Sequence, residues 1–150
     1  MPIRILPDGD ESGGCIRDGA VYLKPGLSGN EIREETLRLM GELAYGIFKP
    51  KLDNFAKAMN VRYSRLLIDD GRRSFGLYNQ VNGDIFHSRR LLMMSDAVID
   101  FLIVHELAHA EEFTHSEEHD AVMEKIIPDY NERDDAFHET CERLIKQGWL

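Results

Sequence analysis

The feature that most constrains this chain is an apolar run from Ala97 to Ala108. Within it only Asp100, His105 and Glu106 are not apolar, and a run of this kind is typical of a helix that is buried nearly all round. A buried helix that carries an imidazole and carboxylates needs a chemical or structural reason for them.

The spacing of the polar residues supplies a reason. His105 and His109 are four residues apart, so in a helix they project from one face and can reach a single metal ion. Glu106 lies beside that face, where it can touch a metal-bound water without being a ligand. This is the HExxH arrangement of two zinc ligands and a general base. The alternative, core histidines and a glutamate satisfied by hydrogen bonds, is disfavoured because the buried helix that the motif requires is present.

Length and composition indicate one domain over residues 1–150, with short strands and a loop in residues 1–27. The hydrophobic content of 43% and charged content of 30% are ordinary for a globular protein. The chain has no apolar run near the ~20 residues of a membrane span and no secretory signal pattern, so we expect a cytoplasmic protein without a membrane partner.

Cys15 and Cys141 are far apart and form no C-x-x-C pattern, so we expect free thiols and a metal site built from histidine and carboxylate. The net charge is −9, and the segment 105–142 carries 13 acidic residues against Lys125 and Arg133. This balance disfavours a nucleic-acid polymer as partner. A set of arginines ahead of the motif could contact anions: Arg62, Arg65, Arg72, Arg73, Arg89 and Arg90.

The first half of the chain predicts short strands at 3–6 and 15–24, the second folded as a hairpin at Asp18-Gly19, with a loop at 7–14. Ser28 or Asn30 can cap a helix that runs to about Phe48. Because Pro50 interrupts the helical pattern, we expect a second helix from Pro50 to about Met59.

The second half predicts three strands at 65–69, 74–78 and 84–87, joined at Asp70-Gly71 and Asn82-Gly83 as an antiparallel meander that 90–94 could continue. Ser95 can cap the HExxH helix and Ser116 the next one, which ends before Pro128. A last helix is expected from about Asn131 to Lys146. The predicted fold class is α+β and zincin-like: a small antiparallel sheet packed against the HExxH helix, with a preceding long helix and a C-terminal helical tail.

Four stretches of the sequence resemble the YgjP-like (DUF45) metallopeptidase domains, which are related to the zincin peptidases. They are Val98–Phe101, His105–His109, Thr114–Ser116 and Ile127–Tyr130, and the resemblance covers roughly residues 62–133. It implies that His115, ten residues after His105, is the third metal ligand. The chain departs from the family pattern at Phe75-Gly76-Leu77, where Trp-Gly-Ser is usual, and at His119, where a bulky apolar residue is usual.

Three neutral imidazoles leave a zinc ion a fourth position for water, and Glu106 can take a proton from that water as it attacks a carbonyl. We therefore expect a zinc metallopeptidase with one Zn²⁺ per chain and a peptide or protein substrate. His119 and Glu124 remain alternative third ligands. The candidates for a hydrogen-bond donor to the reaction intermediate are Tyr78, Arg73, His119 and Tyr130, and His119 could instead support a ligand from outside the coordination sphere.

Two other functions are compatible with the motif. In a metal-dependent nucleotide pyrophosphatase or phosphohydrolase, the arginines between Arg62 and Arg90 would hold phosphates. In a non-catalytic zinc-stabilised binding module, the site would be closed by four protein ligands, and Glu106 would have no role.

Overall fold

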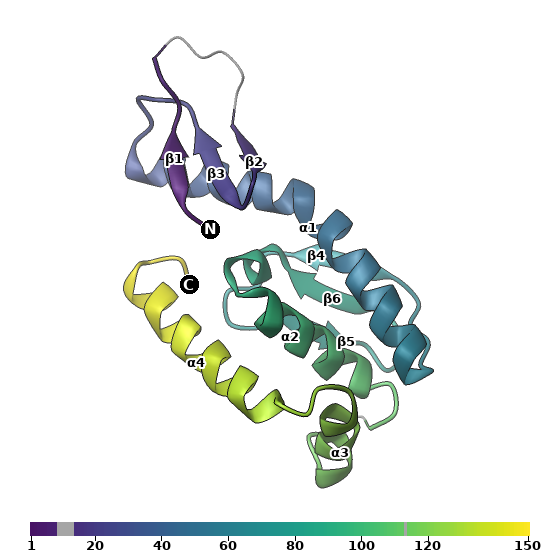
Figure 1. Cartoon of the computed structure of the whole chain (residues 1–150). Coiled ribbons are helices and arrows are strands. Elements are labelled where there is room, and N and C mark those ends of the chain that lie inside the picture. The colour runs from purple at the N-terminus through teal and green to yellow at the C-terminus, as the bar shows by residue number, and fades with distance from the viewer. Residues whose placement is uncertain (9–13, 113) are drawn as a thin grey trace.

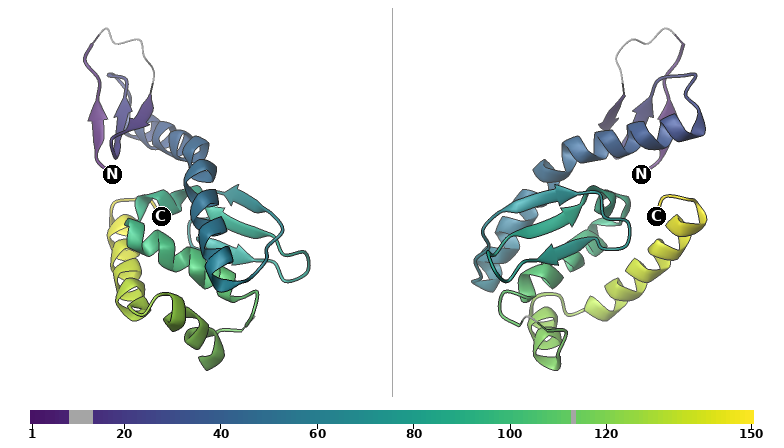
Figure 2. Two further views of the ribbon diagram at one scale, coloured as in Figure 1. Left: turned by 45° about the vertical axis from the view of Figure 1, so that its right-hand side comes forward. Right: turned by 180° about the vertical axis from the view of Figure 1, so that it is seen from behind.

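The computed structural model describes residues 1–8, 14–112 and 114–150. Two small sheets lie along one long helix; the helix at 96–108 packs on the second sheet, and the last two helices pack on that helix (Figure 1). The chain ends lie on the same side of the molecule, as the view from behind also shows (Figure 2). No helix in these ranges is long and apolar enough to cross a membrane.

The first sheet contains β1 (Ile3–Ile5), β2 (Cys15–Arg17) and β3 (Ala20–Leu23) in the order β1-β3-β2. β2 and β3 form the predicted hairpin, in which Asp18 and Gly19 both have positive φ angles, 48° and 71°. That geometry matches the twist of a two-residue hairpin turn. β1 pairs with β3 in parallel, and residues 9–13 of the predicted loop lie outside the described ranges.

A single helix, α1 (Gly29–Met59), follows the first sheet, so the prediction of two helices divided near Pro50 is wrong. Ser28 caps α1 as expected and forms a capping box with Glu31. The helix bends and continues through Pro50 (Figure 2) because both flanks are held by packing. Phe48 and Leu52 are fully buried on either side of the proline, and this burial offsets the backbone bond that proline cannot make.

The second sheet contains β4 (Leu66–Asp69), β5 (Gly76–Tyr78) and β6 (Ile85–Ser88), and it is not the predicted antiparallel meander. The order is β4-β6-β5, with β4 parallel and β5 antiparallel to the central β6. The signal at Asp70-Gly71 makes a local turn, in which the Gly71 amide bonds Asp69, and not a hairpin. Ser88 then bonds the Gly71 carbonyl at 2.7 Å, so the chain crosses the end of β6 before β5 begins.

Residues after β6 form a short 3-10 helix, η1 (Arg89–Met93), and do not extend the sheet. Arg89 and Arg90 both donate to Asp70 Oδ1, at 2.8 and 2.9 Å, which ties η1 to the link between β4 and β5. Arg90 is buried, so this pairing also satisfies a charge that would be costly to leave alone.

The HExxH helix is α2 (Asp96–Ala108), and its Ser95 cap bonds the Val98 amide as predicted. α3 (Glu117–Ile126) is capped by Ser116, and α4 (Tyr130–Lys146) closes the fold. α2 packs against α1, β5, α3 and α4 and lies in the centre of the main core. The prediction of an α+β fold with the motif helix on a small sheet, a long preceding helix and a helical tail is confirmed.

His87 in β6 is fully buried. Its Nδ1 donates to the Phe75 carbonyl at 3.2 Å, and its ring meets Phe48 edge-on at 5.9 Å. Within the described ranges Nε2 has no hydrogen-bond partner. Burial lowers the pKa of His87 to about 4, although the Phe75 carbonyl and the charge of Asp69 act in the opposite direction. The native state therefore holds this imidazole neutral.

This burial predicts a pH-dependent stability. The unfolded chain, with a histidine pKa of about 6.5, binds more protons than the native state between that pH and about pH 4. Stability should fall as pH falls through this window, by on the order of 3 kcal/mol at its lower end. His87→Asn can keep the donor to Phe75 but cannot titrate, so its unfolding free energy should lose less on acidification. Urea titrations at pH values from 8 to 5 measure the unfolding free energy of both proteins. If the two free energies fall by the same amount over this range, this account is wrong.

Candidate metal centre

His105 and His109 project from the last turn of α2, and their ring centroids are 5.1 Å apart. The His109 Nδ1 lies 3.1 Å from the Glu112 carbonyl, which can only accept, so Nδ1 carries the proton. In a neutral imidazole, a proton on Nδ1 leaves Nε2 with its lone pair, the form that binds a metal ion. Burial, with the other histidines adding to it, lowers the pKa of His105 to about 3, so the His105 ring is neutral.

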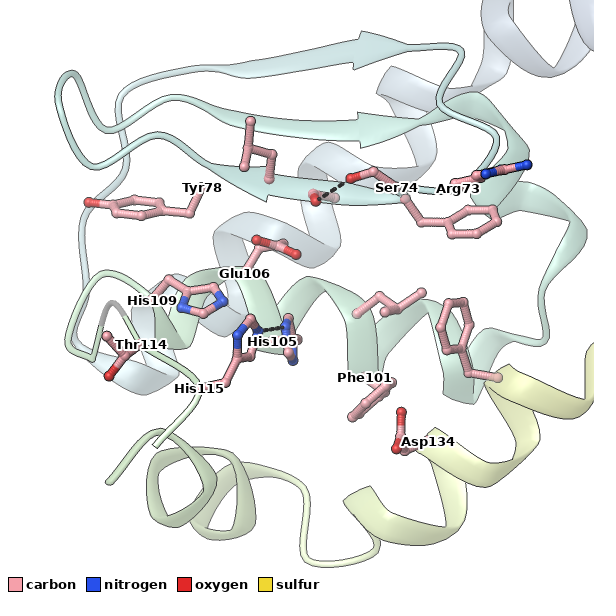
Figure 3. A pocket seen from close by; sticks show the side chains of 15 residues that line it. Arg73, Ser74, Tyr78, Phe101, His105, Glu106, His109, Thr114, His115 and Asp134 are labelled. Atoms are coloured by element: carbon pink, nitrogen blue, oxygen red, sulfur yellow. Dashed lines mark hydrogen bonds between the residues drawn. The ribbon is translucent and has the colours of Figure 1, made fainter. Parts of the chain in front are cut away.

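His115 reaches the same point from the connection between α2 and α3. The chain leaves α2 through tight turns at Ala110 and Glu111, and Ser116 starts the next helix. The Nε2 atoms of His105 and His115 are 2.9 Å apart (Figure 3). One ring nitrogen from each of His105, His109 and His115 lies within 4.8 Å of the others, and His115 is exposed at the open side. Three imidazoles of this kind fit a zinc ion with one position open.

Glu106 lies between the histidines and β5, and its side chain faces the cavity (Figure 3). Burial raises the pKa of its carboxyl group to about 7, while a hydrogen bond from the Tyr78 amide acts in the opposite direction. Gly76 makes room for it: a Cβ atom at position 76 would lie 2.7 Å from the Glu106 Cγ. The Glu106 side chain can therefore occupy this place only because the residue beside it in β5 is a glycine.

A cavity of about 640 Å³ surrounds these residues. The histidines, Glu106, Tyr78 and Thr114 lie toward one end, and Phe101 and Asp134 lie toward the other (Figure 3). Four apolar side chains form a wall of the cavity: Phe75, Phe101, Leu102 and Phe137. Sequence reasoning did not find Gly76 or the apolar wall. A glycine inside a strand is the one available signal, because it often marks the close approach of another group.

The other candidate residues are divided between the cavity and its surroundings. Tyr78 and Arg73 line the cavity. His119 is buried beside the histidines, and its Nε2 bonds the His105 carbonyl at 3.2 Å. Tyr130, at the start of α4, packs against the core, and Glu124 is exposed on α3. Among the described residues, neither His119 nor Glu124 joins the group of convergent metal-binding atoms.

Three of the six arginines that could hold phosphates pair with carboxylates outside the cavity lining. Arg65 pairs with Asp84 at 2.7 Å, and Arg89 and Arg90 bond Asp70. Among the described residues, Arg73 is the one arginine of this set that lines the cavity. The site therefore does not present the cluster of guanidinium groups that a triphosphate would require.

Comparison with known proteins places this site in a class. Residues 5–140 match the family described as the YgjP-like, metallopeptidase domain, which is most of the chain. The protein is thus a metallopeptidase, a hydrolase of peptide bonds. It belongs to the YgjP-like metallopeptidase family, as the sequence motifs predicted. No curated protein matches the chain in sequence.

Two solved structures share the fold. The metallopeptidase zymogen abylysin of Pyrococcus abyssi is 20% identical, with a TM-score of 0.55 over 60% of this chain and 90% of that chain. The metallopeptidase zymogen jannalysin of Methanocaldococcus jannaschii is 14% identical, with a TM-score of 0.55 over 65% of this chain and 96% of that chain. At these identities the likeness concerns the fold.

The contact between Gly76 and Glu106 predicts that Gly76→Ala reduces peptide hydrolysis. The new methyl group would push the carboxylate from its place, and a displacement of about 1 Å in a catalytic group can cost ~10²-fold in rate. Zinc affinity should change little, because the three atoms nearest to the new methyl group all belong to Glu106 and none to a histidine. Gly46→Ala, on the exposed side of α1 with nothing within 4 Å of the new atom, is the matched control and should keep full activity. Activity within a few-fold of wild type in Gly76→Ala would show that Glu106 tolerates displacement.

Proposed function

We propose that this protein is a zinc-dependent metallopeptidase in which His105, His109 and His115 hold one Zn²⁺ and Glu106 is the general base. The observation that carries the proposal is the convergence of three imidazole nitrogens within 4.8 Å, beside a cavity that Glu106 also faces. Neutral imidazole is a preferred zinc ligand, and three such ligands are typical of catalytic sites. We take residues 1–150 as one such domain, with the strands and loop of residues 1–27 at its N-terminal side.

When bound, zinc supplies a Lewis acid for the substrate carbonyl and lowers the pKa of a coordinated water to about 7. The residues of the chain do the rest. Glu106 accepts the proton of the attacking water at a carboxylate oxygen, and in its protonated form it can deliver that proton to the leaving amine. The Tyr78 amide bonds the carboxylate, and the backbone at Gly76 lies directly against its side chain, so the group is held in one place. Tyr78 and Arg73 are the candidates in the cavity for a donor to the developing oxyanion.

The neighbouring sheet supports a peptide as substrate. β5 is an edge strand: it pairs with β6 on one side and borders the cavity on the other. On its outer side, the Tyr78 amide donates to Glu106 and the Gly76 carbonyl accepts from the Ser74 hydroxyl. The main-chain groups of this edge therefore bind partners outside the sheet. Strand edges bind extended peptides through main-chain groups. The apolar wall of the cavity can bury a substrate side chain.

The two alternatives have less support. A nucleotide phosphohydrolase would need several cations at the cavity, and among its described lining residues Arg73 is the one arginine or lysine. A structural zinc module would be closed by a fourth protein ligand, whereas His115 lies at an exposed side of the cluster.

The ligand assignment predicts one zinc per chain. His115→Ala should weaken zinc binding by several orders of magnitude, because two histidines on one helix cannot enclose the ion. Glu124→Ala, the control on α3, should bind zinc as wild type does, since Glu124 is exposed outside the cluster. Zinc titration in competition with a chromophoric chelator measures both. Equal affinity in His115→Ala and wild type would exclude His115 as a ligand.

The general-base assignment predicts that Glu106→Gln keeps the zinc and the fold but loses peptide hydrolysis by ~10²- to 10⁴-fold. The amide preserves the shape of the side chain but cannot accept the proton. The assay uses a mixture of unstructured peptides, with and without a chelator, and a parallel set of nucleoside triphosphates. If only the nucleotides are hydrolysed, and Glu106→Gln abolishes that reaction, the phosphohydrolase is correct and the peptidase is wrong.

A further inference from the structure

His119 is a buried side chain next to the three convergent histidines. It lies in the first turn of α3, where its amide bonds the Ser116 cap, and it is 1% exposed. Its ring centroid is 4.4 Å from that of His109, 4.9 Å from His105 and 5.3 Å from His115. It does not belong to the cavity lining or to the group of convergent metal-binding atoms in the described chain.

The polar contact of His119 is with the main chain of a proposed ligand. Its Nε2 lies 3.2 Å from the His105 carbonyl oxygen, which can only accept, so Nε2 carries the proton and donates. This carbonyl is in the last turn of α2, where the hydrogen-bond pattern changes. The His109 amide bonds the Glu106 carbonyl at 3.2 Å, a contact three residues apart, as the helix tightens at its end. His119 thus supplies a side-chain donor to a carbonyl at the end of α2.

This arrangement has a cost in stability. Once Nε2 carries the proton, Nδ1 is a buried acceptor with no hydrogen-bond partner in the described ranges. The Oδ1 atom of Asp120 is 3.8 Å from this nitrogen, too far for a hydrogen bond. An apolar ring such as phenylalanine would fill similar space without burying an unpaired nitrogen. What histidine adds at this position is the bond to the His105 carbonyl.

We propose that His119 is a positioning residue that fixes the start of α3 to the end of α2 and thereby sets the separation between His105 and His115. His115 is one turn ahead of His119 and directly precedes the Ser116 cap, so anchoring this turn limits where the His115 ring can move. The bond holds the backbone of His105 at the same time. The inference rests on the proposed zinc site and adds to it a residue that acts through two ligands without touching the ion.

The test compares His119→Phe, which keeps the ring and removes the donor, with His119→Gln, whose side-chain amide can restore it. Met123→Leu is the packing control, since Met123 is equally buried one turn further along α3. The first readout is zinc affinity in competition with a chelator, and the second is the electronic absorption of the Co²⁺-substituted protein. Thermal unfolding of the metal-free variants measures packing separately.

We expect His119→Phe to bind one zinc with affinity reduced ~10- to 100-fold, the usual effect of removing a group that orients a metal ligand. His119→Gln should recover to within a few-fold of wild type, and Met123→Leu should match wild type. The Co²⁺ spectrum at saturation should keep its shape in all three variants, because the ligand set is unchanged. Metal-free His119→Phe should unfold at a temperature no lower than that of wild type.

Three results would overturn the inference. Unchanged zinc affinity in His119→Phe would make the ring a packing element. Equal weakening in His119→Phe and His119→Gln would show that the donor is not what matters. A changed Co²⁺ spectrum at saturation in His119→Phe would indicate that His119 is itself a ligand. Failure of the wild-type protein to bind zinc would instead overturn the proposed function, so the two failures are distinguishable.

Discussion

The burial of α2 is the constraint on which the rest of the structure depends. Nine of its 13 residues are buried, and each large apolar side chain among them contributes about 1.5–3 kcal/mol when removed from water. α1, β5, α3 and α4 all pack against it. A helix enclosed on so many sides has one position and one rotation about its axis. The directions of His105, Glu106 and His109 follow from that packing and do not depend on a flexible loop.

On the side of the second sheet, the Glu106 side chain of this fixed helix packs directly against β5. Glu106 is buried, which raises its pKa, and it is nevertheless hydrogen-bonded to the Tyr78 amide and pressed against the backbone at Gly76. The strand that supplies both contacts is also an edge strand, so its other main-chain groups border the cavity. Gly76 and Tyr78 of β5 therefore hold the proposed base, and the same strand offers an edge to an extended chain.

Charges outside the cavity serve mainly to hold the fold together. Asp70 receives hydrogen bonds from Arg89 and Arg90 of η1, and Arg90 is buried. Together with Arg65, which pairs with Asp84, they account for three of the six arginines that suggested a phosphate-binding site. The sequence left a peptidase and a nucleotide phosphohydrolase open. The structure disfavours the phosphohydrolase, because it shows which arginines are already paired with carboxylates.

The sequence by itself determined the local features: the helices capped at Ser28, Ser95 and Ser116, the hairpin at Asp18-Gly19, and the helix that carries the HExxH motif. Each of these depends on residues close together in the chain, so periodicity, caps and spacing are sufficient. Tertiary structure decided the rest. Burial on both flanks of Pro50 kept α1 continuous, and long-range pairing placed β6 between β4 and β5. The approach of Gly76 to Glu106 and of His119 to the His105 carbonyl joins segments that are 30 and 14 residues apart, and no local pattern encodes such distances.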